Sequence, residues 1–475
     1  MVCGISGTRI YAVKGSGLCP RNFFYQLPEK LVSFMKNRFD NIYFKIIISL
    51  FPAVLLLPLC AYPKSLQDNN DSVKVSIARA EKIFLQNNLQ LLAAKYNINA
   101  AKAGIIQAEL WDNPNISIGQ NIYNKFTGKY FDFTKSGNTD LQIQQLIRLA
   151  GKRNDQIKIA EINQNIEEAS FYDLLRALKY ELRTDLNDLF FLQKTLLFYD
   201  GVIPSVKKTV GASEKLFDEH SILLSEVLRL KSLLLTLESE RLNVVTQISG
   251  IENDLNILLA DSSGKYSYYI PQINAESLDS LDINSISLSD AIQTAYETRP
   301  DIKIAQLNMK SEEANLALQK ALAIPDVTIG GSYSRNGSYI PDYLALTLSV
   351  DLPVFNRNQG NIRASEYNIQ ADKTLIDQAR LSVRKDVISA YEKAKETDKL
   401  YQNFDKKFTD EYAKLVSGMI SNYEGKNMTI IEFTDFYESY RSSVLQTIQL
   451  QNSRIDAFEN LNFTAGRDLL LPAGY

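Results

Sequence analysis

The chain has 475 residues, a hydrophobic fraction of 45% and a formal net charge of −3. This charge does not favour nucleic acid or a polybasic membrane surface as a partner, and the length allows two or three ordinary domains. No apolar run reaches the roughly 18 residues that a membrane-spanning helix needs, so the sequence does not predict a helical membrane protein.

The first 61 residues are predicted to be removed from the working protein. Met35 is followed by a basic stretch and then by an apolar run at 46–59, a length of about 14 residues that is typical of a secretory signal peptide. We therefore expect a signal peptide at 35–61, with Met35 as the true start and residues 1–34 as an extension before it. The alternative is that residues 1–34 are a genuine leader.

The three cysteines are Cys3, Cys19 and Cys60. Because no cysteine follows Cys60, the processed chain is predicted to lack disulfides and thiolate metal sites. Cys60 is a candidate for lipid attachment, although Leu59 stands where a small residue is usual. The alternative is an incidental cysteine, with cleavage after Ala61.

Residues 62–74 are polar and are predicted to be an N-terminal linker. A helix is expected over 76–110, and Pro114 ends it because the residue before a proline avoids helical geometry. Ile116 and Ile118 then alternate with polar residues in a first strand, at about 115–124. An aromatic, glycine-bearing loop at 124–138 leads to a return strand at about 139–148.

The most regular strand lies at about 343–352, after a partner strand at about 326–336. Leu344, Leu346, Leu348 and Val350 fall on one face, and Thr347 lies on the other. This period of two is held over about nine residues, the length with which a tilted strand crosses a bilayer. The alternative is an edge strand of a soluble α+β domain.

The chain contains an internal duplication of roughly 200 residues, a period too long for a solenoid repeat. Residues 88–119 align with 299–330 without a gap, so that Pro114 falls on Pro325 and Gly119 on Gly330. Residues 141–163 align with 346–368, where Glu161 falls on Glu366. Each unit is predicted to contain a helix, two strands, a very long helix, a turn and a returning helix.

The long helices are expected at 153–208 and 222–259 in the first unit, and at 361–412 and 429–463 in the second. Their apolar residues follow near-heptad spacing, and no strong helix breaker precedes Gly201 and Pro204. Fifty helical residues span roughly 75 Å at 1.5 Å per residue. Such helices suit a coiled-coil cylinder better than a compact core, with the helices at 76–110 and 288–323 stacked on them.

The order of elements, the duplication and the segments QLIRLAGKR and LPVFNRNQGNIRASE resemble the TolC-like outer-membrane efflux factors. The second segment is most similar to the heavy-metal resistance branch (cobalt-zinc-cadmium and copper-silver). The resemblance implies a mainly α fold with a small β part, in which tandem helical hairpins form an α-helical barrel. Four membrane strands per chain would complete a 12-stranded β-barrel in a homotrimer.

This resemblance divides the chain into a first repeat at 75–260, an equatorial segment at 261–286, a second repeat at 287–466 and a C-terminal tail at 467–475. It implies an outer-membrane exit duct with a long periplasmic extension, in contact with outer-membrane lipid. The partners would be a periplasmic adaptor (membrane fusion) protein and an inner-membrane RND-type pump. The cargo would be heavy-metal cations, conducted passively from the periplasm to the exterior.

The two hairpin turns, at 217–225 and 423–431, are the expected periplasmic tips. Asp218 and Glu219 are predicted to form an acidic ring at the entrance, which would favour cations by Coulomb attraction. The expected adaptor-docking positions are Ser221, Leu224, Gly425, Asn427 and Met428. The alternative is that these are solvated turn residues. Aromatic residues near the strand ends would form belts at the membrane interfaces.

An enzyme is not expected. His220 is the only histidine and lies in a predicted turn without a nucleophile motif, and the acidic residues are scattered along helix faces as ion-pair partners. The processed chain has no thiol, so we predict no catalytic residues, no cofactor and no bound metal. Two alternatives to metal efflux stay open: a duct for multidrug or type I secretion export, and a coiled-coil envelope protein without a pore.

Overall fold

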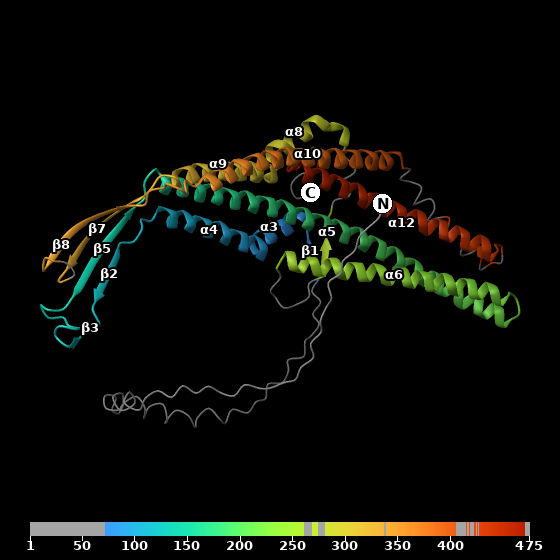
Figure 1. Cartoon of the computed structure of the whole chain (residues 1–475). Helices are drawn as coiled ribbons and strands as arrows, with labels where there is room; N and C mark the ends of the chain where they lie inside the picture. Colours follow the sequence, from blue (N-terminus) through green and yellow to red (C-terminus); the bar gives the residue numbers. More distant parts are fainter. Residues whose placement is uncertain are drawn as a thin grey trace, which may run out of the picture. The chain divides into compact units, whose positions relative to one another are not determined.

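The computed structural model describes residues 72–260, 268–273, 281–336, 339–404, 415, 418, 422–423, 425 and 427–470. The expectations for residues 1–34, the signal peptide, Cys60 and most of the C-terminal tail lie outside the described residues. Figure 1 shows the described part: long helices, and at one end of them a sheet of extended strands.

Two long helical hairpins dominate the structure. In the first, α5 (Lys152–Asp218) runs for 67 residues, and α6 (Leu224–Leu258) packs back along it. In the second, α10 (Gln359–Asn403) packs against α12 (Ile430–Ala465). At 1.5 Å per residue α5 is about 100 Å long, far longer than a compact domain requires.

Helix α5 continues through Pro204 for fourteen further residues, so the region of Gly201 and Pro204 does not end it. A proline inside a helix removes one backbone hydrogen bond. Here Tyr199, Val206 and Val210, on both sides of the proline, are buried in one apolar cluster with residues of α6 and α12. We attribute the continuity of the helix to this packing.

The helices expected at 76–110 and 288–323 are each broken once, which corrects both predictions. The first divides into α3 (Ile77–Asn87) and α4 (Leu89–Glu109), and the second into α8 (Leu288–Thr298) and α9 (Pro300–Leu322). Both breaks have a physical cause. The Asn88 side chain caps α4 by accepting from the Leu91 N–H, and Pro300 forces Arg299 into an extended conformation. Asn88 and Arg299 are equivalent in the duplication.

The end of the predicted linker is also corrected. Ser72–Val75 forms β1, which pairs in parallel with β6 (Tyr268–Pro271) from the segment between the repeats. Val75 and Tyr269 are almost fully buried in a cluster with Phe84 and Leu182. Because these strands have only four residues each, this burial, more than the backbone pairing, holds them in place.

The four long strands form one antiparallel sheet in the order β2-β5-β7-β8. Their bounds are Asn115–Gln120, Thr139–Ile147, Val327–Ser334 and Tyr343–Val350. The pairing of β5 with β7 joins the two repeats into one sheet. Between β2 and β5 a small hairpin is formed by β3 (Tyr123–Asn124) and β4 (Lys129–Tyr130).

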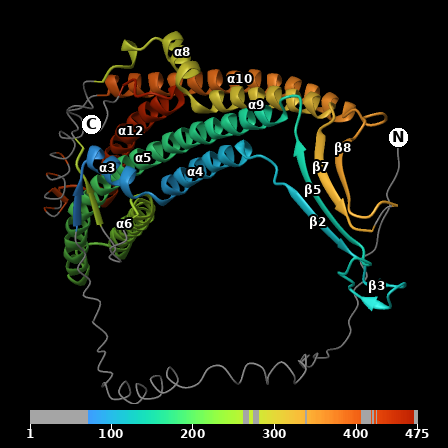
Figure 2. The same cartoon turned by 90° about the vertical axis from the view of Figure 1, so that its left-hand side faces the viewer.

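The helices pack as a single curved layer next to the sheet. Helix α5 contacts α4, α6, α9 and α12, and α9 in turn contacts α10. Figure 2 shows α4, α5, α9 and α10 side by side where they lead into the strands. The buried apolar residues are divided among separate clusters along the helices. The described residues therefore form no single central core, as expected for a wall element.

Candidate functional site

The four-stranded sheet has one apolar and one polar face. Residues paired across an antiparallel sheet point to the same side, so the register assigns each side chain to a face. The apolar face carries Ile116, Ile118, Leu141, Ile143, Ile329, Tyr333, Leu344, Leu346, Leu348 and Val350. The polar face carries Ser117, Gln142, Gln144, Thr328, Ser332, Thr347 and Ser349.

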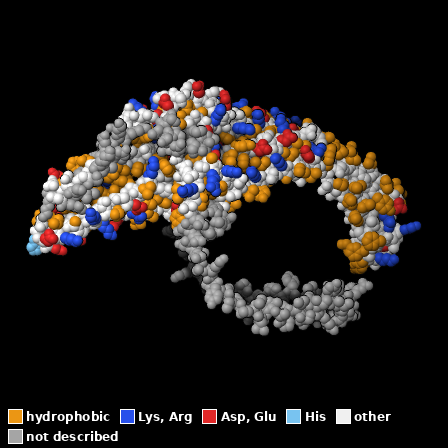
Figure 3. Space-filling view, turned by 180° about the vertical axis from the view of Figure 1, so that it is seen from behind, with side chains coloured by type: hydrophobic (Ala, Val, Ile, Leu, Met, Phe, Trp, Pro, Cys, Tyr) orange, Lys and Arg blue, Asp and Glu red, His pale blue; other side chains and the backbone are white. Residues whose placement is uncertain are grey.

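The apolar face is not covered by any described part of the chain. Leu346 is 85% exposed, Leu344 80% and Ile118 71%. Figure 3 shows hydrophobic side chains gathered along the strands and their loops, whereas charged side chains are spread over the helices. Large contiguous apolar patches are rare on soluble monomers, so this face requires an apolar environment.

The predicted membrane residues Ile116, Ile118, Leu344, Leu346, Leu348 and Val350 therefore all lie on one face, although they come from both repeats. Two residues near the helical end of β5 depart from the alternation: Gln145 lies on the apolar face and Leu146 on the polar face. The Gln145 amide donates to the Asp112 carbonyl at 2.8 Å, which satisfies it at the edge of the sheet.

Charged residues fix the junction between strands and helices. Lys152, at the start of α5, is 3% exposed, and its ammonium group lies 2.6 Å from the Asp326 carboxylate of the second repeat. Asp326 also accepts from the Leu149 N–H at 2.8 Å. Burial acts to raise the pKa of Asp326, but the hydrogen bond and charge of Lys152 outweigh it and lower the pKa. The QLIRLAGKR segment thus links the two repeats beside the sheet.

The first predicted tip lies at the opposite end of α5. Asp218 ends the helix and Leu224 begins α6, while Asp218, Glu219, Ser221 and Leu224 are all exposed. His220, between them, has a positive φ of 59° and is also exposed. In Figure 3 the single His-coloured side chain marks this tip, far from the strands.

The second tip lies at the same end of the molecule. Gly425 and Asn427 are exposed, whereas Met428 is partly buried against a cluster that includes Tyr423 and Phe433. The same cluster contains Leu230 of α6. The two hairpins are therefore packed together near their turns, at the end of the molecule that carries the predicted entrance residues.

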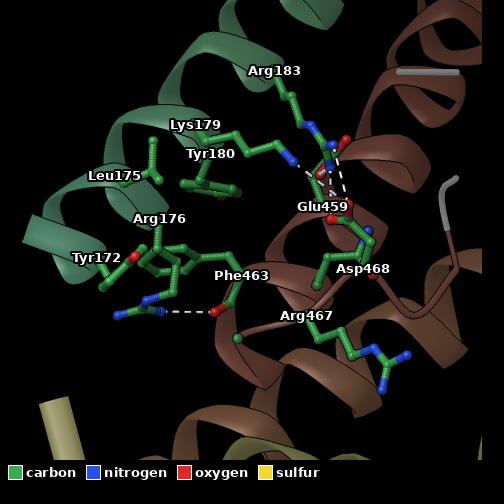
Figure 4. Close-up of a pocket in the computed structure, with 12 residues that line it drawn as sticks. Tyr172, Leu175, Arg176, Lys179, Tyr180, Arg183, Glu459, Phe463, Arg467 and Asp468 are labelled. Atoms are coloured by element: carbon green, nitrogen blue, oxygen red, sulfur yellow. Dashed lines mark hydrogen bonds and ion pairs between the residues drawn. The ribbon is translucent and has the colours of Figure 1, made fainter. Parts of the chain in front are cut away.

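A buried charge network at mid-length was not predicted. Arg183 of α5 is 2% exposed and lies 2.6 Å from Glu81, 3.3 Å from Glu459 and 2.9 Å from Asp468. Figure 4 shows Arg183 with Glu459 and Asp468. Its partners come from α3, α12 and the segment after α12. Burial acts to lower the pKa of Arg183, but these carboxylates raise it. The network thus joins the first repeat to the end of the second.

A hollow of about 350 Å³ lies beside this network. Arg176 and Lys179 line it, and both make ion pairs, with Asp173 and with Glu81 and Asp468. Since Arg176, Lys179 and Arg183 are each paired with carboxylates, we interpret the hollow as a structural junction. Arg454 makes a similar link, to Asp398 at 2.6 Å. Ion pairs along the helix faces were predicted from the sequence, but these buried links were not, because their partners are remote in the chain.

Among the described residues, no group of three or more His, Cys, Asp or Glu side chains is arranged to hold a metal ion. No helix in the described ranges combines the length and the apolar character needed to cross a membrane.

One family model and two curated proteins match the sequence of this chain. The model of the family described as outer membrane efflux protein matches residues 291–467. The cobalt-zinc-cadmium resistance protein CzcC of Cupriavidus metallidurans is 21% identical over 305 residues, which cover 63% of this chain and 67% of CzcC. The nickel-cobalt-cadmium resistance protein NccC of Alcaligenes xylosoxydans xylosoxydans is 21% identical over 344 residues, 69% of this chain and 73% of NccC.

Solved structures share the fold. CusC, described as undergoing transmembrane channel formation, superimposes with a TM-score of 0.66 at 16% identity, over 83% of this chain and 93% of CusC. The Campylobacter jejuni CmeC outer membrane channel gives a TM-score of 0.68 at 13% identity, over 83% of this chain and 86% of CmeC. At these identities the structures establish the fold alone. Taken with the family match over residues 291–467 and the two curated relatives, they lead to one conclusion: the chain is similar in sequence to outer membrane efflux proteins and has the fold of the solved outer-membrane channels.

Proposed function

We propose that three copies of this chain form the exit duct of a tripartite efflux system that conducts heavy-metal cations out of the periplasm. The observation that carries the proposal is the two-faced sheet. At most positions its apolar side chains lie on one face and its polar side chains on the other, and this holds across all four strands and both repeats. A water-filled membrane pore needs this pattern, with apolar residues toward lipid and polar residues toward the lumen.

Trimer formation follows from the open edges of the sheet. Within the described residues, β2 and β8 each pair on one side only, and an unpaired edge is costly in lipid. Four strands are too few for a pore, and even the smallest outer-membrane barrels have about eight. Three copies would supply twelve strands and pair every edge, and their helical hairpins would continue the wall as an α-helical barrel.

The tips support the second part of the proposal. The exposed Asp218, Glu219 and Ser221 lie at the end opposite the sheet, as do the exposed Gly425 and Asn427 of the second hairpin, and the two hairpins pack together near this end. In the trimer these positions would surround the periplasmic entrance, with Leu224 and Met428. The acidic pair would attract cations, and the neighbouring residues would receive the adaptor protein, through which an inner-membrane RND-type pump delivers cargo.

The choice of heavy-metal cargo is based on the relatives, because CzcC and NccC are both named for resistance to divalent metals. The duct itself would select little, since the described residues contain no metal-binding cluster. The selection would then belong to the pump and the adaptor. We infer a transport protein without catalytic activity or cofactor.

Deletion of the chain in its own cells tests the function. We expect the mutant to retain more zinc, cobalt and cadmium after a metal load, with its tolerance of organic drugs unchanged and its metal efflux restored by the gene. Loss of drug tolerance with normal metal efflux would instead indicate multidrug export. Normal handling of metals, drugs and secreted proteins would contradict an efflux function.

A further inference from the structure

The loop between β2 and β5, residues 121–138, buries the polar side chains of Asn124 and Asp132 and exposes its large apolar side chains. Asn124 is 5% exposed and Asp132 is 2% exposed, whereas Phe126 is 101% and Tyr130 72% exposed. The exposed apolar side chains are Ile122, Tyr123, Phe126, Tyr130, Phe131 and Phe133. A loop built for water would show the opposite arrangement, because apolar groups gain free energy by leaving water.

A hydrogen-bond network centred on Asp132 holds the loop in this form. One carboxylate oxygen accepts from the Thr134 N–H at 3.0 Å and from its hydroxyl at 2.6 Å. The other accepts from the Thr127 hydroxyl at 2.7 Å and the Asn124 amide at 3.1 Å. These bonds, those of Thr134 first, lower the pKa of Asp132 to about 2, so the network stays charged at any physiological pH.

Backbone contacts add to this rigidity. A Cβ at Gly137 would lie 1.5 Å from the Asp132 carbonyl oxygen, so the chain crosses here at a distance that only glycine allows. Residues that follow β7 also form hydrogen bonds to the loop at 121–138. Asn336 donates to the carbonyls of Lys135 and Gly137 at 2.6 and 2.9 Å, and Arg335 donates to that of Phe133 at 2.8 Å. The loop backbone that carries the aromatic side chains is therefore held in one conformation by these hydrogen bonds and contacts.

We propose that residues 121–138 form a lipid-binding element that places its aromatic rings among the headgroups of the outer leaflet, with Lys125, Lys129 and Lys135 on the anionic lipid phosphates. The proposal builds on the proposed function, because it needs the sheet to lie in the membrane with the helical tips on the periplasmic side. The loop then emerges on the external side.

Three features favour lipid as the occupant. Ile122 follows Ile116 and Ile118 of β2 along the chain, and all three side chains are exposed. Aromatic rings, tyrosine above all, are suited to the headgroup region because they join an apolar body to a polar group. The three lysines are exposed between the aromatic residues, and cations at this position are attracted to an anionic lipid surface.

Fluorescence quenching in reconstituted bilayers tests the element. Trp111 is the only tryptophan, so a Trp111→Phe background gives a chain without indole. In it, Phe126→Trp places one indole at the loop, where the native ring is fully exposed. We expect this indole to be blue-shifted, and to lose intensity when ordinary lipid is replaced by brominated phosphatidylglycerol. The loss should be smaller in brominated phosphatidylcholine, and adding Lys125→Gln, Lys129→Gln and Lys135→Gln should remove the difference.

Two matched variants make each outcome decisive. Leu348→Trp reports on the apolar face of the sheet and should be quenched, whereas Tyr172→Trp, on the exposed surface of α5, should not. Quenching at position 348 but not at 126 would overturn the lipid-binding element alone, and a blue shift without quenching would instead indicate a protein occupant such as the loop of a second copy. Absence of quenching at both positions would contradict the membrane sheet, and the proposed function with it.

Discussion

Asp456 of α12 is a carboxyl group that the chain partly buries beside other acidic residues. Burial raises its pKa to about 7, the charges of Asp188 and Glu459 act in the same direction, and Lys393 opposes them. The folded chain therefore holds a proton here that the unfolded chain, with a pKa near 3.8, releases. The contribution of Asp456 to stability is consequently lost as the pH rises from about 4 to about 7.

We predict that Asp456→Asn raises the midpoint of thermal unfolding at pH 8 and leaves it nearly unchanged at pH 4, because the amide cannot ionise. Thermal unfolding of the detergent-solubilised protein, followed by circular dichroism at both pH values, measures this. Asp435→Asn, at an exposed position of the same helix, is the control. An equal effect of the two substitutions at pH 8 would show that burial of Asp456 does not control the change.

The facing of β8 gives a second prediction for single residues. Leu348 is 70% exposed on the apolar face, and Thr347, its neighbour in the chain, lies on the polar face. We expect Leu348→Arg to lower the amount of protein assembled in the outer membrane, because a cation facing lipid near the midplane costs about 2–4 kcal/mol. Thr347→Arg should assemble almost normally. Fractionated membranes measure both variants, and equal losses would refute the assigned facing.

At the scale of elements, β7 has two adjacent glycines with different surroundings. A Cβ at Gly330 would meet the Ile143 carbonyl at 2.7 Å and the Thr347 hydroxyl at 2.8 Å, whereas at Gly331 it would meet only the Ala345 carbonyl, at 3.9 Å. Gly330 thus allows three strands to approach closely on the polar face. Gly331 leaves a shallow hollow on the apolar face.

We therefore predict that Gly330→Ala destabilises the sheet by about 1–3 kcal/mol, the usual range for overpacking. Gly331→Ala should have little effect, because its methyl group enters open space. Urea unfolding of the protein in detergent, monitored at the strand-specific infrared band, distinguishes the two. A larger loss for Gly331→Ala would mean that the register of β7 is misassigned.

The strands and the long helices could be predicted because each carries a pattern of its own. Leu344, Leu346 and Leu348 alternate so regularly that the strand and its two faces follow from the sequence alone. The helix breaks at Asn88 and Arg299 were missed, since the apolar spacing continues across both. The breaks depend on local features, which are a capping side chain at Asn88 and Pro300 after Arg299. The long run of helical apolar spacing on both sides outweighed these local features in the prediction.

The remaining features depend on contacts between distant parts of the chain. Arg183 and Glu459 are separated by 276 positions, so nothing near either residue indicates that they are buried together. The parallel pairing of β1 with β6 has the same character, because four-residue strands carry too little alternation to be recognised. The loop at 121–138 was recognised as aromatic, but its buried network required the coordinates.

At the scale of the whole molecule, the described residues between 72 and 470 have the form of a segment of a wall. Their helices form a curved layer in which the buried residues make no single central core, and the sheet has an apolar face and edges that no described residue covers. In the proposed duct, such a chain would need copies of itself to complete its hydrogen bonds and to enclose a lumen. The proposed adaptor-docking and entrance roles of the tips depend on this assembly, because only a closed ring has an entrance.

The mass of the detergent-extracted protein tests this central claim most directly. Light scattering, with the contribution of bound detergent subtracted, gives the mass of the polypeptide alone. We predict three times the mass of the processed chain, measured on the same sample by mass spectrometry. A polypeptide mass equal to one chain, in protein that retains its native helix content, would contradict the closed twelve-stranded barrel. It would therefore also contradict the proposed duct.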